Sequence, residues 1–264
     1  MGEARACDLG HDLPVQPTQQ KIWRAGRFWW DWPQPGETKV QPLRAMIFDL
    51  DALADLDSAG HRPAFNAAFA ELGLDVEWSE SRYRQLQVLS DERRRVAAEL
   101  RKRGICTECD VLAELLVDEI CVTKEMILGE TILDADISPR AGLVDLITEA
   151  FGAGIGIGVV SNGSHAWVEP LVRQLVGEGV AGVVVTGDDA HEGNLFAAAL
   201  AELGIAGADA LAFVGTHIAE RAATVAGMPT VAIDRDDVAG APLRMAECRR
   251  IHDHWRDSHR PSAA

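Results

Sequence analysis

Short apolar runs recur along the chain from residue 45 onward, separated by segments with the spacing of amphipathic helices. The runs cover residues 45–50, 154–160, 180–186, 210–215 and 229–233, and the helical segments cover 141–152, 165–177, 195–204 and 217–227. Apolar runs of this length without polar alternation are typical of parallel strands that are buried on both faces. Strands that alternate with helices in this way predict an α/β fold built on a doubly wound parallel sheet.

A long segment between the first two of these strands, residues 63–137, has helical periodicity and no apolar run of similar strength. Tyr83 and Leu86 follow the helical spacing. A second group with this spacing consists of Val111, Leu112, Leu115 and Leu116. We interpret residues 63–137 as a small helical cap over the strand ends, inserted into an α/β core made of residues 45–62 and 138–235.

The two ends of the chain differ from this core. Residues 1–44 are rich in Pro, Gln and Gly, and four of the seven tryptophans fall between Trp23 and Trp32. Trp and Arg are enriched in interface cores. This Trp-rich extension is therefore either an arm packed on its own domain or a docking element for a protein partner or a second subunit. Residues 236–264 form a polar C-terminal helix or tail.

The C-terminal segment carries three closely spaced histidines, His252, His254 and His259. Closely spaced histidines can bind a metal ion. In a terminal polar segment, however, we expect them on a solvated surface.

Composition and charge exclude several classes of partner. The chain has 264 residues, of which 47% are hydrophobic, and a formal net charge of -16. Nucleic acid and anionic membranes are bound chiefly through clustered Lys and Arg, so neither is an expected partner. The amino terminus lacks the apolar core of a secretory signal and no stretch is apolar enough to span a membrane, which predicts a cytoplasmic protein.

The five cysteines are an odd number, which favours reduced thiols over a disulfide framework. Cys106 and Cys109 have a spacing found in metal and redox sites, but no second Cys pair or His follows at zinc-site distance. We interpret this pair as two partly buried thiols near the start of a helix.

Two carboxylates lie one residue apart where the first predicted strand ends, in the run Ala45-Met-Ile-Phe-Asp49-Leu-Asp51. Open α/β sheets place their ligands at the carboxyl ends of the strands. One acid of such a pair can act as a nucleophile and the other as a proton donor. Asp49 and Asp51 are therefore the candidate catalytic residues.

A series of further motifs follows this acid pair. The motifs are Phe48-Asp49-Leu-Asp51, Gly60-His61-Arg62-Pro-Ala-Phe65-Asn66, Pro139-Arg140-Ala-Gly142, Val159-Val160-Ser161-Asn162-Gly163, Thr186-Gly-Asp188-Asp189 and Ala222-Ala223-Thr-Val-Ala-Gly227-Met228. Together with the helical cap, this series resembles the haloacid dehalogenase superfamily, and within it the branch of β-phosphoglucomutase and the CbbY-like sugar-bisphosphate phosphatases. The resemblance covers about residues 45–235.

The resemblance implies a mechanism through an aspartyl phosphate on a small phosphorylated metabolite. Asp49 would attack phosphorus, and Asp51 would protonate the leaving oxygen and later activate water. Ser161, with Asn162 beside it, would hold the transferring phosphoryl oxygens, unless Asn162 simply caps the next helix. The residues implied to hold Mg²⁺ are Asp49, Asp51, Asp188 and Asp189.

Arg93 is the candidate substrate-binding residue of the cap. It lies in Asp91-Glu-Arg-Arg-Arg95, a region that in the similar phosphomutases contacts the distal phosphate of the substrate. A solvated helix face is the alternative interpretation of this charged run.

Three positions depart from the family pattern. Ala52-Leu53 replaces Gly-Thr after the acid pair, no Lys follows the third strand of the core, and Val214-Gly215-Thr216 replaces an acidic Glu-Asp-Ser. The missing Lys would neutralise the phosphoryl group, and the missing acids would hold Mg²⁺ opposite the nucleophile. Glu220 or His217 could replace these acids, but we expect both on the outer turns of the following helix.

Three functions are consistent with these observations. The favoured one is a decayed phosphatase site in a weakly active or non-catalytic protein that binds a ligand or a partner. The alternative is an active Mg²⁺-dependent phosphohydrolase or phosphomutase, supported by the survival of both acids and Ser161. A metal-free dehalogenase that uses Asp49 is the third, and Asp51 argues against it. Enzymatic activity and homo-oligomer formation are left open.

Overall fold

The computed structural model describes residues 20–24, 27–31, 43–89, 91–105, 109–189, 193–233 and 244–259. The chain divides into two compact units, residues 1–40 and 41–264. In the first unit, strands β1 (Gln20–Arg24) and β2 (Arg27–Asp31) form an antiparallel hairpin. This strand pair is an element that the composition of the Trp-rich extension did not predict.

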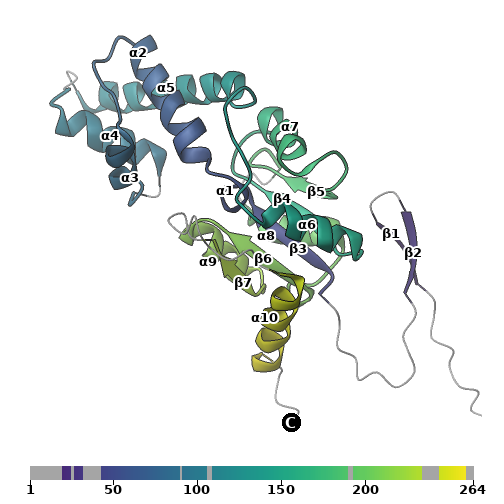
Figure 1. The fold of residues 1–264 in the computed structure, drawn as a ribbon. Coiled ribbons are helices and arrows are strands. Elements are labelled where there is room, and N and C mark those ends of the chain that lie inside the picture. The colour runs from purple at the N-terminus through teal and green to yellow at the C-terminus, as the bar shows by residue number, and fades with distance from the viewer. Residues whose placement is uncertain are drawn as a thin grey trace, which may run out of the picture. The chain divides into compact units, whose positions relative to one another are not determined.

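A five-stranded parallel sheet forms the centre of the second unit, in the order β5-β4-β3-β6-β7 (Figure 1). The strands are β3 (Ala45–Asp49), β4 (Gly156–Val160), β5 (Val183–Val185), β6 (Ala210–Val214) and β7 (Thr230–Ala232). β3 lies between two strands and is covered on both faces, so all of its residues are buried. The five predicted strands and the doubly wound fold are confirmed.

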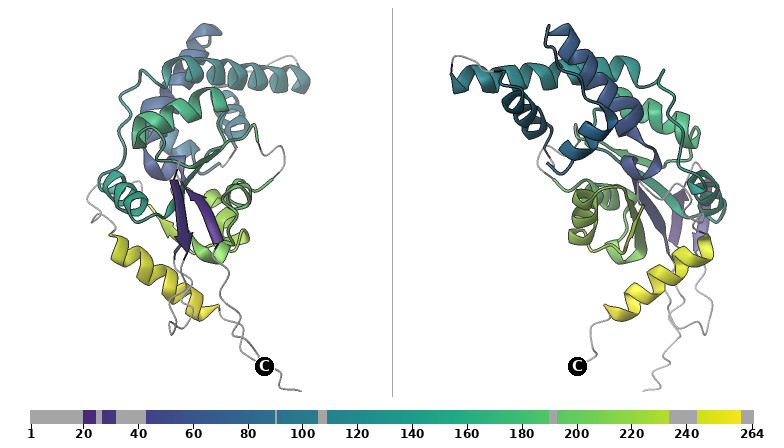
Figure 2. Two further views of the ribbon diagram at one scale, coloured as in Figure 1. Left: turned by 90° about the vertical axis from the view of Figure 1, so that its right-hand side faces the viewer. Right: turned by 60° about the vertical axis from the view of Figure 1, so that its left-hand side comes forward.

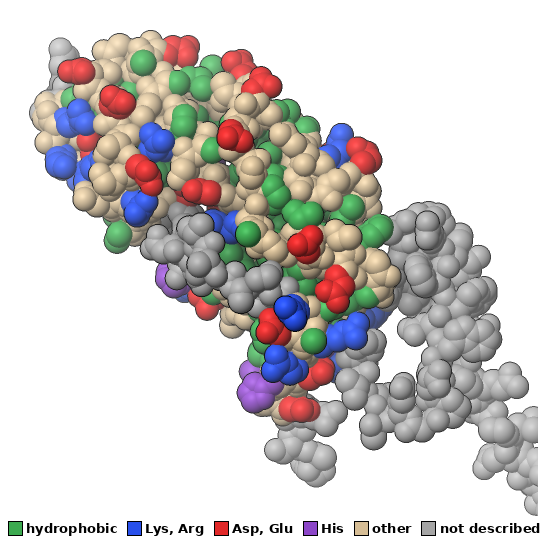
Figure 3. Space-filling view, in the orientation of Figure 1, with side chains coloured by type: hydrophobic (Ala, Val, Ile, Leu, Met, Phe, Trp, Pro, Cys, Tyr) green, Lys and Arg blue, Asp and Glu red, His purple; other side chains and the backbone are tan. Residues whose placement is uncertain are grey.

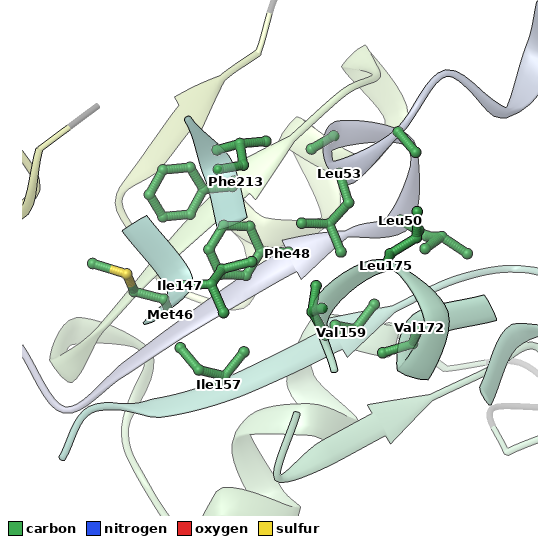
Figure 4. Packing of buried hydrophobic residues seen from close by; sticks show 14 of the residues in the cluster. Met46, Phe48, Leu50, Leu53, Ile147, Ile157, Val159, Val172, Leu175 and Phe213 are labelled. Carbon is green, nitrogen blue, oxygen red and sulfur yellow. The ribbon is translucent and has the colours of Figure 1, made fainter. Parts of the chain in front are cut away.

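Helices cover both faces of this sheet. One face carries α6 (Leu143–Gly152), α7 (His165–Val176) and α10 (Met245–Ser258), and the other carries α8 (Leu195–Leu203) and α9 (His217–Val225). A short 3₁₀ turn, η2 (Gly207–Asp209), precedes β6. Met46 and Phe48 of β3 belong to the buried cluster of the first face, and Ile47 between them belongs to that of the second. Phe48 stacks on Phe213 of β6 with ring centroids 4.5 Å apart (Figure 4).

Four helices form an insert between β3 and β4, on the side of the sheet where β3 leads into α1 (Figure 1 and Figure 2). They are α2 (Arg62–Glu71), α3 (Glu80–Leu86), α4 (Glu92–Lys102) and α5 (Asp110–Thr131), and α1 (Leu50–Leu53) and a π-helical turn η1 (Asp57–His61) precede them. The insert has its own buried cluster around Phe65 and Trp78, whereas Leu128 and Ile132 join the cluster of the sheet. Its role as a cap stays a prediction.

Helix α10 buries one of the three terminal histidines. His252 has no exposed surface, and its Nε2 lies 2.9 Å from the carbonyl oxygen of Ala208. His254 and His259 are exposed. The expectation of a solvated surface is therefore wrong for His252, because α10 packs its apolar side, with Met245, into the cluster on the first face of the sheet.

Charged side chains of both signs are intermixed over the face of the molecule in Figure 3. Such a mixture differs from the clustered Lys and Arg through which proteins bind nucleic acid. Among the described helices, none has both the length and the apolar character that crossing a membrane needs. Cys109 is the N-cap of α5, as predicted, but it is exposed, so the expectation of a partly buried thiol is wrong for it. Cys106 lies outside the described residues.

A buried carboxylate, Glu99, holds the insert together. It is 2% exposed, and its two oxygens accept hydrogen bonds from Nε of Arg82 at 2.8 Å and Nε of Arg103 at 2.7 Å. Arg103 also donates to the carbonyl oxygens of Asp75 and Glu77, which lie in the loop before α3. Burial alone would raise the pKa of Glu99, but the hydrogen bonds from Arg103 and Arg82 outweigh it and hold this pKa below its usual range.

We expect Glu99→Gln to lower the free energy of unfolding by about 1–3 kcal/mol near pH 7, because two arginines lose their charged partner. A carboxylate with a lowered pKa stabilises the fold above its unfolded pKa, and this stabilisation disappears as the pH falls through the folded pKa. The difference between the two proteins should therefore shrink below the ordinary value of 4.5. Chemical denaturation near pH 7 and about pH 3 measures it.

Glu80→Gln is the matched control. Glu80 and its partner Arg84 are 61% and 65% exposed, so this ion pair should contribute less than about 0.5 kcal/mol. Equal losses of stability in the two variants near pH 7 would contradict the role given to Glu99.

Candidate functional site

Asp49 is the last residue of β3 and the N-cap of α1, so its side chain leaves the sheet at the carboxyl edge. It is 8% exposed. Its Oδ2 accepts a hydrogen bond from the backbone N–H of Gly215 at 3.3 Å, and Gly215 directly follows β6. Asp51 lies two residues on, in the first turn of α1. The carboxylate of Asp49 is thus held where the two central strands end.

Ser161 follows β4 and lies at the same edge of the sheet. Asp49 pairs in register with Val160, so Ser161 stands one residue beyond that pair. Ser161 is 7% exposed, and its Oγ accepts a hydrogen bond from the N–H of Gly163 at 3.2 Å. The structure therefore brings Ser161 to the strand end beside Asp49, as the sequence predicted.

Asn162 is exposed and does not cap the next helix. Ser164 is the N-cap of α7, and the N–H of His165 donates to Oδ2 of Asp188 at 2.8 Å. The capping interpretation of Asn162 is wrong, because α7 begins two residues later than that role requires and a carboxylate from another loop satisfies its first turn.

Asp189 organises the loop after β5. Its Oδ2 accepts hydrogen bonds from the N–H of Thr186 at 2.8 Å and the hydroxyl of Thr186 at 3.1 Å, and its Oδ1 lies 2.8 Å from Nε2 of His165. The hydrogen bond from the backbone of Thr186, followed by that from His165, holds the pKa of Asp189 below its usual range. The hydrogen bond with Asp189 raises the pKa of His165. Asp188 and Asp189 thus already serve as partners of α7 and of their own loop.

Gly215 stands where the family pattern has an acidic residue, and the structure leaves no space for a side chain there. A Cβ added to Gly215 would lie 2.6 Å from the carbonyl carbon of Asp51, 2.7 Å from its carbonyl oxygen and 2.8 Å from the backbone nitrogen of Ala52. All three are backbone atoms, so no side-chain rotation relieves the contact. The backbone of α1 fills the volume that an acid at this position would use.

His217 and Glu220 lie on α9, just beyond this glycine. Nδ1 of His217 lies 3.2 Å from Oε2 of Glu220, and the His217 side chain is fully exposed. The expectation that both residues occupy the outer turns of the helix is confirmed, so neither replaces the missing acid.

The described residues at this edge do not fit a magnesium site. Mg²⁺ prefers six oxygen ligands in a near-ideal octahedron. Asp49 and Asp51 lie at the site, but Asp188 and Asp189 bind their own loop and α7. Within the ranges that the structure describes, no three His, Cys, Asp or Glu side chains gather in a way that could hold a metal ion.

Arg93 and Lys124 are engaged by acidic residues of the insert. Arg93 is half exposed and forms an ion pair with Asp118 of α5. The ammonium of Lys124 is buried and lies 2.9 Å and 3.1 Å from the two carboxylate oxygens of Glu92, and 3.4 Å from Oε2 of Glu125. The predicted contact of Arg93 with a substrate phosphate stays a prediction.

Arg140 contacts the site although the sequence analysis gave it no role. Its Nη2 donates to the carbonyl oxygen of Asp51 at 3.3 Å, and its backbone N–H donates to that of Leu53 at 2.7 Å. Arg140 stands within the motif Pro139-Arg140-Ala-Gly142, but a motif alone does not say which loop a side chain reaches.

Trp167 of α7 also borders the site without having been singled out. It is 2% exposed, and a Cβ added to Gly163 would lie 2.0 Å from Cζ2 of its ring. Its Nε1 donates to Oε1 of Glu125 at 3.1 Å. Trp167 thus joins the loop after β4 to helix α5 of the insert. A Trp at helical spacing is typical of any core, so its sequence position gave no signal of this link.

The chain is similar to hydrolases of one family. A family model of haloacid dehalogenase-like hydrolases matches residues 40–215. The protein CbbY of Cereibacter sphaeroides is 31% identical over 193 residues, which are 70% of this chain and 82% of that protein. The plasmid CbbY protein of Cupriavidus necator is 29% identical over 197 residues, which are 72% of this chain and 77% of that protein.

Solved structures give the same result. CbbY from Rhodobacter sphaeroides in complex with phosphate has a TM-score of 0.59 and 28% identity, covering 77% of this chain and 94% of that chain. A hydrolase of Entamoeba histolytica has a TM-score of 0.61 at 14% identity, over 79% of this chain and 99% of that chain, which shows the fold alone. The family model spans Asp49, Ser161 and the helical insert, and the chain belongs to the haloacid dehalogenase-like hydrolase family.

Proposed function

We propose that this chain binds a small phosphorylated metabolite at the carboxyl edge of β3 and β4, and that its phosphoryl-transfer activity is weak or absent. The observation that carries this proposal is the contact between Gly215 and the backbone of Asp51. That contact removes the position from which the family's acidic residue would hold a metal ion beside the nucleophile.

The balance of charge supports weak catalysis. Phosphoryl transfer requires positive charge at the transferring group. Of the lysines whose burial the structure describes, Lys124 is buried against Glu92, and Lys102 lies exposed on α4. Removing one preorganised donor costs about 3–4 kcal/mol, and a metal ion contributes several kcal/mol more. Losing both therefore lowers the rate by about 10⁴-fold or more.

The class of ligand is inferred from relatives and from the residues that persist. CbbY from Rhodobacter sphaeroides has been crystallised with phosphate, and an Asp-to-Asn mutant of it with xylulose-(1,5)bisphosphate. In this chain Ser161 keeps its place beside Asp49. A hydroxyl and the backbone N–H groups of a loop are suited to phosphate oxygens even without a metal ion.

An active Mg²⁺-dependent phosphohydrolase or phosphomutase is the second candidate. It is favoured by the retained geometry of Asp49, whose carboxylate is nearly buried and receives a hydrogen bond from Gly215. A carboxylate with no role in catalysis would not need this buried, hydrogen-bonded position, so the geometry of Asp49 favours an active enzyme. For this candidate, the contact between Gly215 and Asp51 would have to open and another residue would have to supply the missing charge.

The two candidates differ in the effect of Asp49→Asn. We expect wild type and Asp49→Asn to show the same absence of Mg²⁺-dependent turnover on a panel of phosphoesters, because the metal site is incomplete. Calorimetry should detect binding of inorganic phosphate by the wild type. Mg²⁺-dependent turnover by the wild type that disappears in Asp49→Asn would instead establish the phosphohydrolase.

The crowding around Gly215 has its own consequence. We expect Gly215→Ala to lower the free energy of unfolding by about 1–3 kcal/mol, because a methyl group there overlaps the Asp51 backbone. We expect Gly215→Asp to restore no Mg²⁺-dependent phosphatase activity, for the same reason. Denaturant titration and a phosphoester assay with Mg²⁺ are the measurements.

Gly129→Ala is the control for this prediction. Gly129 lies in α5, and the nearest atom to an added Cβ is Cδ1 of Trp167 at 3.9 Å. Ala favours a helix over Gly by up to about 1 kcal/mol, so this variant should be as stable as the wild type or more stable. Mg²⁺-dependent phosphatase activity in Gly215→Asp would show that the backbone of Asp51 moves to accommodate a side chain. It would contradict the proposal that the site is closed to a metal ion.

We also propose that the Trp-rich extension docks on a second copy of the chain. The hairpin of β1 and β2 has only two strands, and a two-stranded hairpin by itself is marginally stable in water. Four of the seven tryptophans fall between Trp23 and Trp32, and Trp is enriched in interface cores, so a second copy of the chain is the surface that we propose for this hairpin.

Deletion of residues 1–40 tests this docking. We expect the shortened protein to keep a cooperative unfolding transition, because residues 41–264 form a compact unit of their own. Light scattering should give a larger particle mass for the full chain than for a monomer, and a monomer mass for the shortened chain. An unchanged assembly after deletion would remove the docking role.

A further inference from the structure

Arg140 is fixed to the loop that carries the two aspartates. Pro139 forms an isolated antiparallel bridge with Ala54. The next backbone N–H, that of Arg140, donates to the carbonyl oxygen of Leu53 at 2.7 Å, and Nη2 of Arg140 donates to that of Asp51 at 3.3 Å. The main chain and the side chain of Arg140 therefore both contact the segment after Asp49, and the guanidinium is held beside the end of β3.

Most of the donors of this guanidinium are unused by the described part of the protein. A guanidinium has five N–H donors, and one of them serves Asp51. Nε of Arg140 is buried and has no hydrogen-bond partner. An unsatisfied buried donor costs about 1–3 kcal/mol, and more when the group is charged. A ligand that accepts hydrogen bonds from this side chain would remove that cost.

Several other arginines are paired with carboxylates, whereas Arg62, like Arg140, donates to a carbonyl oxygen and has a buried Nε without a hydrogen-bond partner. Arg82 and Arg103 bind Glu99, and Arg44 lies 4.0 Å from Asp209. For Arg140, the described residues provide a carbonyl oxygen and no carboxylate within ion-pair distance. Arg140 thus brings a positive charge to the loop after β3, at the edge of the sheet where Asp49 and Ser161 lie.

Arg140 and Gly215 both lie close to the carbonyl group of Asp51. The oxygen of Asp51 that accepts from Arg140 is also the atom 2.7 Å from the position of a Cβ on Gly215. Gly215 in turn donates its N–H to Asp49. The segment from Asp49 to Asp51 thus accepts hydrogen bonds from both Gly215 and Arg140, and a side chain at residue 215 would overlap the backbone of Asp51.

We propose that Arg140 is the cation of this site and that it binds the oxyanion of the ligand, a phosphate monoester, without a metal ion. A guanidinium presents two parallel N–H donors that match two phosphate oxygens, so it recognises phosphate through a fork as well as through charge. This inference rests on the proposed function in one respect, that the ligand is phosphorylated. The inference adds a source of positive charge to the proposed function. In the family pattern this charge comes from a Lys and from a metal ion held by an acid, and this chain has neither residue at those positions.

Calorimetric titration of inorganic phosphate in excess EDTA tests this role, with the full chain as wild type, Arg140→Gln, Arg140→Lys and Arg221→Gln. We expect the wild type to bind phosphate without metal and Arg140→Gln to bind about 10- to 100-fold more weakly. Arg140→Lys should fall between them, since it keeps the charge and loses the fork. Arg221→Gln removes the same charge from an exposed position on α9 and should bind as the wild type does.

Equal phosphate affinity in Arg140→Gln and wild type would overturn the inference, because the phosphate would then be held elsewhere. A wild type that binds phosphate only when Mg²⁺ is added would overturn it too. Thermal melting of each variant shows whether it is folded, and Arg140→Lys keeps the comparison decisive if Arg140→Gln is not. Mg²⁺-dependent turnover would contradict the proposed function, yet a loss of metal-free affinity in Arg140→Gln would still support Arg140 as the cation.

Discussion

The close approach of Gly215 to the backbone of Asp51 is the constraint on which the rest of this site depends. Its N–H positions the carboxylate of Asp49, and its lack of a side chain lets the backbone of α1 fold against the end of β6. A single residue thus holds the candidate nucleophile and closes the place of a metal-binding acid. The two effects are inseparable, because a side chain that restored the acid would displace the segment that carries Asp51.

The sheet makes this constraint rigid. β3 and β6 are neighbours in the middle of the sheet, and Phe48 stacks on Phe213 between them and the helices of one face (Figure 4). Close-packed interiors transmit strain and do not deform smoothly when atoms are added. A larger residue at 215 therefore cannot be absorbed by a small shift of one strand. The register of β3 and β6 therefore fixes the position of Gly215 relative to Asp49 and Asp51.

The helical insert is bound to this sheet by more than its two connections. Leu128 and Ile132 of its last helix and turn lie in the cluster of the sheet, and Trp167 of α7 donates a hydrogen bond to Glu125 of α5. Inside the insert, Glu99 and Lys124 are each satisfied by opposite charges. Arg140 differs from these residues, because it stands at the junction with donors that the described chain does not use.

Compared with the family pattern, the site has changed its source of positive charge: the acid that holds a metal ion is missing, and a guanidinium lies at the loop instead. A family site balances its carboxylates with a divalent cation and a Lys. Here the negative groups Asp49 and Asp51 persist, and among the described residues Arg140 is a positive group in contact with their loop. A guanidinium carries one positive charge and cannot polarise an oxygen as Mg²⁺ does, so binding of phosphate is easier to sustain at such a site than its transfer.

From the sequence alone, the strands of the sheet and the helices that cover it could be predicted, because apolar periodicity is a local property of the chain. The placement of Asp49 and Ser161 at one edge could also be predicted, because parallel strands end at the same edge of a sheet. The departures from the family at Gly215 and after the third strand were also visible there.

The tertiary structure decided what these departures mean. The contact of Gly215 with Asp49 joins residues 166 positions apart, and that of Arg140 with Asp51 joins residues 89 apart. The burial of His252 and the partners of Asp188 and Asp189 likewise depend on which distant backbone groups need a hydrogen bond. Such pairings follow from the packing of whole elements, and no local pattern in the chain encodes them.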